Sequence, residues 1–431
     1  MGYARVCSMA LIGVVGKIVV VEADVAAGLP RLVMSGLPDA ALTESRDRVR
    51  AAVLNSGEQW PQQRLTVNLL PAHLPKHGSG FDLAVALAIL AAAGAVPDDA
   101  LDEMALLGEL GLDGTVRPVR GVLPAALGAA RAGARTMVVP AENAAEAHLV
   151  SDIQVLAVDT LARLVRFVRR QGTLLDPPAP VPRQAPVLAD LADVLGQERG
   201  RRAVGLAAAG GHHLALLGPP GAGKTMLAQR LPGVLPRLDD IAAQETTAIH
   251  SIAGLLAPGS PLIRVPPYQA PHHTTSEAAL VGGGAGLARP GALSLAHHGV
   301  LFLDEAPEFR LSALNALRQP LEEGEVRLRR SGGETAYPAC TQLVLAANPC
   351  PCAAVAGDRD CQCSPLARRR YLGRLSGPLM DRIDLRVTLP PVRAAALLGA
   401  AREGEPSAEI AERVATARAA AAARWGRGRL P

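Results

Sequence analysis

The segment HLALLGPPGAGKTMLAQRL spans residues 213–231 and decides how the chain folds. It starts with a short apolar run, continues through GPPGAGKT at 218–225, and ends in a stretch typical of a helix. Glycines in such a loop let successive backbone N–H groups turn toward an anion at the N-terminus of the helix. A strand, a glycine-rich loop and a helix in this order predict a nucleotide-phosphate loop rather than a chance turn.

The residues of this loop have distinct predicted roles. Lys224 would reach the β- and γ-phosphates of ATP, and the hydroxyl of Thr225 would ligate Mg²⁺. Among 44 basic residues only Lys17, Lys76 and Lys224 are lysine, and a tight phosphate site needs the compact ammonium that arginine lacks. The remaining residues would cradle the phosphates with their backbone: Gly218, Pro219, Pro220, Gly221, Ala222 and Gly223.

Two later apolar runs would end at the same site. Residues 300–303 read VLFL and lead into Asp304 and Glu305. Asp304 would hold Mg²⁺ through its water shell, and Glu305 would orient and polarise the attacking water. Residues 342–347 lead into Asn348, whose amide would hold the same water against the γ-phosphate. A surface turn is the alternative interpretation of the acidic pair.

Longer motifs run in order along nearly the whole chain. They read VNLLPAHLPKHGSGFDLAVALAIL, GELGLDGTVRP, GQERGRRAVGLAAAGGHHLALLGPPGAGKTMLA, PHHTTSEAALVGGG, SLAHHGVLFLDEAPEF, ALRQPLEEGEV, AANPCPC and SGPLMDRIDL. With them the chain closely resembles the YifB/ComM family of magnesium-chelatase-like AAA+ ATPases. The resemblance implies a ring, usually a hexamer, that acts in DNA branch migration during recombination and natural transformation.

The resemblance also implies roles for single residues. Asp304 and Glu305 match the family's Mg²⁺ and water-activating pair, and Asn348 matches its first sensor. Arg382 in LMDRIDL matches the arginine finger, which acts on the ATP of a neighbouring subunit. The alternative for Arg382 is a helix-surface arginine paired with Asp381 or Asp384.

The expected fold class is α/β, with two domains. Residues 1–172 alternate Val-rich strands with Ala/Leu-rich helices, and the resemblance implies a Lon-protease-like (ribosomal S5-type 2-like) domain there. A proline-rich linker is predicted at 173–187, and an AAA+ αβα core at 188–391. Residues 392–431 would begin a helical lid that the chain does not complete. They are expected to form an Ala- and Arg-rich helix with no evident packing partner. The family's lid carries a second sensor arginine.

The Lon-like domain is expected to be catalytically inactive. A serine–lysine peptidase needs its nucleophile and its base within hydrogen-bond reach. Gly80 aligns with the serine of the active pattern, Ser79 falls one position early, and Leu123 aligns with the lysine. We assign Lys76 to the surface or to the packing of a turn.

Five of the six cysteines lie after position 339, unlike the framework of a secreted disulfide protein. Cys350, Cys352, Cys361 and Cys363 form two C-x-C pairs, and four thiolates could close a tetrahedral zinc site. Reduced thiols in a cytosolic loop are the alternative, because the usual spacing is C-x-x-C. His272 and His273 would point apart in a strand, so we interpret them as structural or DNA-facing.

Composition narrows the choice of partners. No apolar stretch is long enough for a membrane span, and an alternating Val-rich pattern near residue 20 indicates a folded cytoplasmic domain. Aromatic residues make up 2% of the chain and the net charge is +4, so contacts to DNA would use arginine rather than base stacking. Residues 368–386 are locally basic, either a phosphate contact or a solvated face. Arg327, Arg329 and Arg330 are predicted to lie on a pore-facing hairpin.

Three functions remain open at this point. The first is a motor ATPase acting on single-stranded or branched DNA, with the substrate implied by the resemblance. The second is a magnesium-chelatase-type ATPase that remodels a protein partner. The third is a nucleotide-binding scaffold without turnover.

Overall fold

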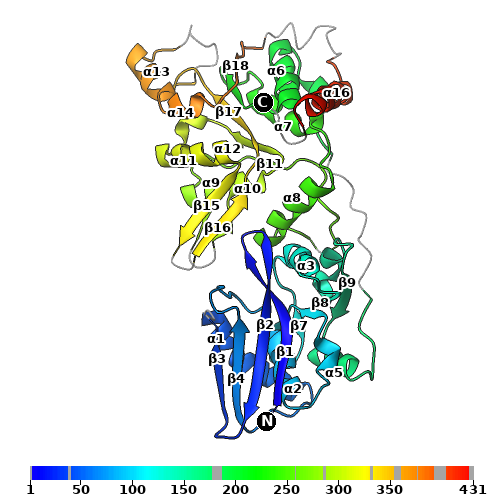
Figure 1. Cartoon of the computed structure of the whole chain (residues 1–431). Coiled ribbons are helices and arrows are strands. Elements are labelled where there is room, and N and C mark those ends of the chain that lie inside the picture. Colours follow the sequence, from blue (N-terminus) through cyan, green and yellow to red (C-terminus); the bar gives the residue numbers. More distant parts are fainter. Residues whose placement is uncertain are drawn as a thin grey trace. The chain divides into compact units, whose positions relative to one another are not determined.

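The computed structural model describes residues 2–36, 40–176, 187–257, 259–284, 288–330, 333–353, 361–375, 377–392 and 404–426. The chain divides into two compact units, drawn in Figure 1. The first comprises Met1–Arg183, Thr247–Leu262 and Arg329–Thr335, and the second comprises Gln184–Thr246, Ile263–Leu328 and Ala336–Pro431. Most of the predicted linker lies outside the described residues. Within the described ranges, no helix is both long and apolar enough for a membrane span.

The first unit is built on a mixed seven-stranded sheet in the order β3-β4-β2-β1-β5-β8-β9. β1 and β2 form a long antiparallel hairpin, whereas β5, β8 and β9 add to it in parallel. Its strands are β1 (Gly2–Ile12), β2 (Val15–Ala26), β3 (Arg31–Ser35), β4 (Arg64–Leu70), β5 (Met104–Leu106), β8 (Thr136–Pro140) and β9 (Gln154–Val158), with the short pair β6 (Glu109–Leu110) and β7 (Val116–Arg117). Its helices are α1 (Ala40–Asn55), α2 (Asp82–Ala92), α3 (Val122–Arg131), α4 (Ala144–Ala147) and α5 (Leu161–Val168).

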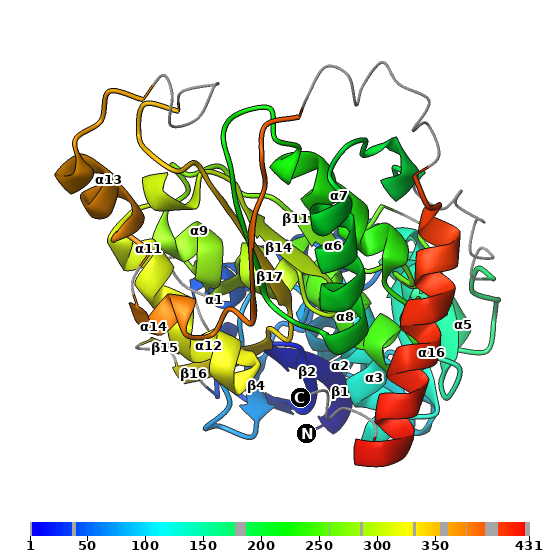
Figure 2. The same ribbon diagram turned by 90° about the horizontal axis from the view of Figure 1, so that it is seen from above.

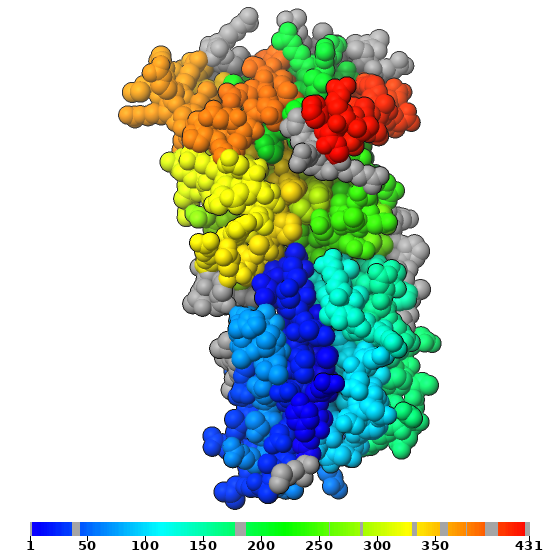
Figure 3. Space-filling view, viewed as in Figure 1, coloured from blue at the N-terminus to red at the C-terminus, as the bar shows by residue number. Residues whose placement is uncertain are grey.

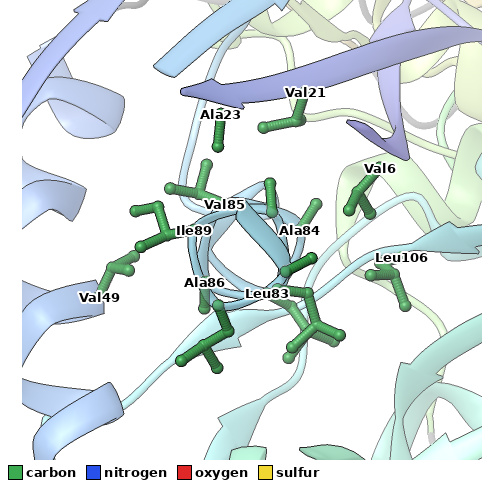
Figure 4. Close-up of a cluster of buried hydrophobic side chains, with 14 of the residues drawn as sticks. Val6, Val21, Ala23, Val49, Leu83, Ala84, Val85, Ala86, Ile89 and Leu106 are labelled. Atoms are coloured by element: carbon green, nitrogen blue, oxygen red, sulfur yellow. The ribbon is translucent and has the colours of Figure 1, made fainter. Parts of the chain in front are cut away.

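Helix α2 is the centre of the first unit's core. Every residue of α2 is buried, as its composition of Ala, Leu, Val and Ile after one aspartate requires. Figure 4 shows Val85 and Ala84 of α2 beneath Val21 and Ala23 of β2, with Val49 of α1 beside Ile89. This is the mixed α/β domain expected from the sequence.

The second unit contains a five-stranded parallel sheet in the order β11-β14-β17-β10-β18. Its strands are β10 (Leu214–Leu217), β11 (Tyr268–Gln269), β14 (Val300–Leu303), β17 (Gln342–Ala347) and β18 (Leu385–Thr388), accompanied by the short pair β12 (Gly282–Gly283) with β13 (Arg289–Pro290). A further short pair, β15 (Glu325–Arg330) with β16 (Gly333–Pro338), has residues in both units. Its helices are α6 (Glu198–Gly210), α7 (Lys224–Val234), α9 (Glu277–Val281), α10 (Ala292–Leu295), α11 (Leu311–Ala316), α12 (Arg318–Glu323), α13 (Pro365–Leu372), α14 (Gly377–Met380) and α16 (Ser407–Trp425), and α8 (Asp240–Ala253) has residues in both units.

Both faces of this parallel sheet are covered by helices. Successive residues of β14 alternate between two cores: Val300 and Phe302 face one core, and Leu301 and Leu303 face the other. In Figure 2, α6, α7 and α16 lie on one side of β14 and β17, and α9 and α11 lie on the other. Every residue of β14 and β17 is buried, as expected for central strands of a parallel sheet. The predicted αβα architecture is confirmed.

The C-terminal helix α16 does have a packing partner, so that part of the sequence interpretation is wrong. Ile410 and Val414 are buried in the same core as residues of α6 and α7. The rest of α16 forms a continuous patch on the surface of the second unit (Figure 3). These two apolar residues are four positions apart, so they lie on the same face of the helix.

Candidate functional site

The phosphate loop predicted at 218–225 lies between β10 and α7. Gly221 and Gly223 have φ values of +73° and +81°, in the left-handed region that residues with a Cβ rarely adopt. The loop leads directly into the first turn of α7, whose backbone N–H groups have no partner within the helix. The N-terminus of α7 can therefore receive an anion.

Lys224 begins α7, and its side chain folds back over the loop. Nζ donates hydrogen bonds to the carbonyl oxygens of Gly218 at 2.7 Å and Pro219 at 3.0 Å, and to Oδ1 of Asn348 at 2.9 Å. Burial lowers the pKa of Lys224, and the nearby acidic pair opposes that shift. The structure thus places the predicted lysine and the predicted sensor in direct contact.

Thr225 and Asp304 also meet at this site. Oγ1 of Thr225 donates a hydrogen bond to Oδ2 of Asp304 at 2.7 Å. In the sheet, β17 lies between β10 and β14, so Asn348, which follows β17, lies between the loop and the acidic pair. A cavity of about 370 Å³ is lined by the loop residues Pro220, Gly221, Ala222, Gly223, Lys224, Thr225 and Met226 together with Asp304, Glu305, Ala347, Asn348 and Ala353.

Glu305 has an unusual backbone conformation. Its φ and ψ of 49° and 41° are left-handed, which costs a residue with a Cβ roughly 1–3 kcal/mol. Its N–H donates to Oδ1 of Asp304 at 2.9 Å. Strained residues of this kind are typical of functional sites, where the surrounding structure over-determines them.

The oxygen ligands at this edge suit Mg²⁺. A hydroxyl and a carboxylate lie 2.7 Å apart beside the open cavity, and Mg²⁺ is usually held by one or two such oxygens together with phosphates and waters. The donor set therefore fits a Mg-nucleotide.

Arg382 lies away from the phosphate loop of its own chain. It lies three residues before the start of β18, at the amino end of the parallel sheet, whereas the loop follows the carboxyl end of β10. Its guanidinium donates to the carbonyl of Pro378 at 2.6 Å and to the carboxylate of Glu322. These described contacts of Arg382 do not include Asp381 or Asp384, the two partners expected in the alternative interpretation.

The four clustered cysteines come together in space. Sγ of Cys350 lies 3.1 Å from that of Cys352 and 3.3 Å from that of Cys361, and the four sulfur atoms, including that of Cys363, lie within 4.8 Å of one another. The backbone N–H of Cys363 and the neighbouring thiols lower the pKa of Cys361 to about 6. Four sulfurs around one zinc would be roughly 3.8 Å apart at a Zn–S distance of ~2.3 Å, so the donor set fits this metal.

Sequence reasoning missed the contact between His273 and the acidic pair. Nδ1 of His273 lies 3.4 Å from Oε2 of Glu305. The two neighbouring histidines do not point apart, because they lie in a loop rather than a strand, and their rings are 4.1 Å apart between centroids. No pattern around His272 and His273 in the sequence predicted this contact.

A second cluster joins Glu245 to His297 and His298. Oε2 of Glu245 lies 3.4 Å from Nε2 of His297 and 3.0 Å from Nε2 of His298, and these hydrogen bonds lower the pKa of Glu245 to about 2. Nδ1 of His297 accepts the backbone N–H of Cys340 at 3.1 Å, so Nε2 carries the proton of the neutral ring. A ligating histidine normally donates from its other nitrogen, so this cluster fits a structural hydrogen-bond network better than a metal site.

In the first unit, Lys76 is fully buried rather than at the surface, which corrects the surface alternative. Nζ of Lys76 donates to the carbonyls of Gly36, at 2.8 Å, and Pro71, and burial lowers its pKa. Its role is therefore to pack the turn after β4. Ser79 donates instead to the carboxylate of Glu109, and Leu123 is buried.

The predicted arginine hairpin consists of β15 and β16. Arg327 pairs with Glu325 at 2.5 Å, and Arg329, with a side chain 80% exposed, pairs with Glu334 at 3.5 Å. The side chain of Arg330 lies outside the described residues. Exposed pairs of this kind contribute little free energy, so a phosphate can displace the carboxylates at small cost.

Comparisons with known proteins agree with this architecture. A family model described as "Magnesium chelatase, subunit ChlI" matches residues 190–397, and one described as "Subunit ChlI of Mg-chelatase" matches residues 21–143. The chain is 57% identical to an uncharacterized protein of Mycobacterium tuberculosis H37Rv over 99% of this chain and 84% of that protein. YifB of Escherichia coli and the competence protein ComM of Haemophilus influenzae are each 42% identical to it, over 97% and 96% of this chain and 82% of each relative. A stretch of 138 residues is also 33% identical to the Lon protease of Chloroflexus aurantiacus, covering 30% of this chain and 16% of that protein.

Proposed function

Because this chain belongs to the YifB/ComM family of magnesium-chelatase-like AAA+ proteins, we propose that it binds Mg-ATP at residues 218–225 and hydrolyses it. The observation that carries the proposal is the convergence of Lys224 with Asn348 and of Thr225 with Asp304 at one edge of the sheet. Phosphoryl transfer depends mainly on positioning and charge neutralisation, and these contacts bring together the side chains that supply both.

Each residue at this edge has a distinct role in the proposal. The backbone N–H groups at the start of α7 bind the phosphates, and Lys224 exchanges its carbonyl partners for phosphate oxygens. Thr225 and Asp304 hold Mg²⁺, which neutralises charge on the phosphates when bound. Glu305 orients a water and accepts its proton, and Asn348 holds that water in line.

We further propose that the chain acts as a homo-oligomeric ring, with six subunits as the expected number. Arg382 lies at the opposite end of the sheet from its own phosphate loop, and this placement supports action on the ATP of a neighbouring subunit. Breaking the surface ion pair between Arg382 and Glu322 should cost little free energy. Hydrolysis would then depend on contact between subunits.

The proposed substrate is single-stranded or branched DNA in the cytoplasm, with a role in recombination and competence. The relative named competence protein ComM supports this assignment, and so do the exposed arginines of the β15–β16 hairpin. Such contacts are made to phosphates, so binding should fall steeply with salt and depend little on base sequence.

We predict that changing Arg327, Arg329 and Arg330 together to alanine weakens the stimulation of ATP hydrolysis by forked DNA. It should also flatten the salt dependence of DNA binding, because up to three phosphate contacts are lost. Hydrolysis without DNA should stay unchanged. The measurement is phosphate release across a titration of forked DNA at several salt concentrations.

A matched control removes the same charge elsewhere. Arg5, Arg135 and Arg413 are also exposed arginines paired with carboxylates. Their triple alanine variant should keep the stimulation by DNA. Equal losses in both triple variants would mean that only net charge matters, and the hairpin would not be the DNA contact.

We also propose that Cys350, Cys352, Cys361 and Cys363 hold a structural zinc ion. The proximity of their sulfur atoms supports this proposal, and thiolates are preferred zinc ligands. Cys350 lies two residues after Asn348, so the metal would stabilise the segment that leaves the nucleotide site.

We predict about one zinc ion per chain in freshly purified protein. The double variant Cys350→Ser, Cys361→Ser should lose the metal, because a structural site needs its full set of thiolates. Cys7 and Cys340 are the matched controls, because they lie outside the cluster, and their replacement by serine should leave the zinc content unchanged. Metal analysis that finds no zinc in the unmodified chain would exclude the site.

We propose that the first unit does not cleave peptides. Ser79 donates to Glu109 and Lys76 donates to two backbone carbonyls, so each is engaged with another partner. Leu123 offers no base at the aligned position.

A further inference from the structure

The segment from Asn348 to Ala353 forms part of the wall of the nucleotide cavity. Both end residues line that cavity, and Oδ1 of Asn348 accepts a hydrogen bond from Nζ of Lys224 at 2.9 Å. Cys350 and Cys352, two of the four clustered cysteines, lie between these ends. A metal ion bound to their sulfur atoms would therefore be held by the same short segment that lines the nucleotide site.

The backbone of this segment needs support from outside. Ala353 has a φ of +49°, a left-handed conformation that costs a residue with a Cβ roughly 1–3 kcal/mol. The turn before it is closed by a long hydrogen bond, from the N–H of Ala353 to the carbonyl oxygen of Cys350 at 3.3 Å. Bonds from one metal ion to Cys350 and Cys352 would hold the turn more firmly, because both sulfur atoms would share one fixed centre.

The second cysteine pair reaches Asn348 by another route. Cys363 directly precedes Ser364, whose side chain caps the start of α13 by accepting a backbone N–H at 3.2 Å. Near the other end of this helix Tyr371 is buried, which raises its pKa to about 12, and the backbone N–H of Asn348 beside its oxygen opposes that shift. Both halves of the cysteine cluster thus lead to the same residue of the nucleotide site.

We infer that the four-cysteine site and the nucleotide site are energetically coupled, so that a zinc ion on the four sulfur atoms raises the affinity of the chain for Mg-ATP. Without the metal, the nucleotide has to order residues 348–353 when it binds, whereas the metal has already ordered them. Coupling between two sites is reciprocal, so bound Mg-ATP raises the affinity for zinc by the same factor. The inference rests on the proposed nucleotide and zinc sites, and it makes zinc a regulator of the ATPase.

The first measurement determines the affinity for zinc. The full chain with its zinc is titrated with a chromogenic chelator, with and without a saturating Mg²⁺ complex of a non-hydrolysable ATP analogue. The analogue should raise the affinity for zinc about 5-fold to 100-fold, the usual range of coupling between two sites. Because nucleotides also bind zinc in solution, the control is Lys224→Ala at an analogue concentration that saturates only the unmodified chain. In this control the affinity for zinc should not rise.

The second measurement determines the affinity for the analogue. The double variant Cys350→Ser, Cys361→Ser should bind the analogue more weakly, by the factor found for zinc. The matched control Cys7→Ser, Cys340→Ser removes two cysteines that lie outside the cluster. It should bind the analogue as tightly as the unmodified chain does.

The variant Asn348→Ala separates a local link from a general loss of folding. It keeps all four cysteines, so its affinity for zinc without nucleotide should be unchanged. The rise in zinc affinity caused by a saturating concentration of the analogue should largely disappear, because the contact between Asn348 and Lys224 is lost. A link through the stability of the whole unit would survive this substitution.

Two results would overturn the inference. One is an affinity for zinc that stays the same when the analogue saturates the unmodified chain, and the other is an undiminished effect of the analogue in Asn348→Ala. Failure of the proposals beneath it gives different results. A chain that binds the analogue but holds no zinc lacks the metal site, and a chain that holds zinc but does not bind the analogue lacks the nucleotide site.

Discussion

Replacing Lys224 with alanine should weaken the binding of Mg-ATP by roughly 30-fold or more. The ammonium is buried at the start of α7, and removing one member of a desolvated charge pair costs about 2–5 kcal/mol. Glu305→Gln should leave nucleotide affinity nearly unchanged and lower hydrolysis about 10²-fold to 10⁴-fold, because the amide cannot accept a proton. Equilibrium binding of a fluorescent ATP analogue and single-turnover hydrolysis measure the two effects.

The control for this pair of variants is Lys17→Ala, which removes another lysine from an exposed position in β2. Neither binding nor hydrolysis should change. Wild-type affinity in Lys224→Ala would contradict the phosphate-loop assignment. Wild-type hydrolysis in Glu305→Gln would contradict only the role of the carboxylate.

Replacing Arg382 with alanine should reduce hydrolysis by about 10³-fold, the lower end of the effect of an arginine supplied by a neighbouring subunit. Nucleotide binding and assembly should be retained, because Arg382 lies at the far end of the sheet from its own phosphate loop. Sedimentation with Mg-ATP and phosphate release measure assembly and hydrolysis separately.

Mixing inactive variants tests whether Arg382 acts between subunits. Lys224→Ala subunits keep Arg382, and Arg382→Ala subunits keep the phosphate loop. Some interfaces in a mixed ring would then contain both groups, and hydrolysis should recover in part. The matched control mixes Arg382→Ala with Lys224→Ala, Arg382→Ala, in which no arginine is available. The same low rate in both mixtures would show that Arg382 does not act in trans.

The parts of the site that the sequence predicts are local in the chain. The loop at 218–225 and the apolar runs that become β14 and β17 follow from short patterns of glycine and apolar residues. Parallel pairing then places Asp304 and Asn348 near the loop, because the carboxyl ends of such strands share an edge. The cysteine spacing raised a zinc site as one of two options, and the structure brings the sulfur atoms within reach of one ion.

The remaining features depend on contacts between distant residues. Glu245 meets His297 across 52 positions, and no periodic pattern links them. The contact between His273 and Glu305 requires the strand register of β11 and β14, and β11 has only two residues. From the sequence alone Lys76 is compatible with a surface position, because only the structure shows that backbone carbonyls accept hydrogen bonds from its ammonium. A single sequence carries no signal for such tertiary contacts.

Steady-state phosphate release from Mg-ATP by the full chain and by Glu305→Gln, each with and without forked DNA at low salt, measures whether this site hydrolyses ATP and whether DNA stimulates it. The unmodified chain should release phosphate in a Mg²⁺-dependent manner and faster when forked DNA is added, whereas Glu305→Gln should release almost none in either condition. Release that is equal in the two proteins would contradict hydrolysis at the site formed by Lys224, Asp304 and Glu305. Turnover that forked DNA leaves unchanged would contradict the proposed DNA motor and favour remodelling of a protein partner.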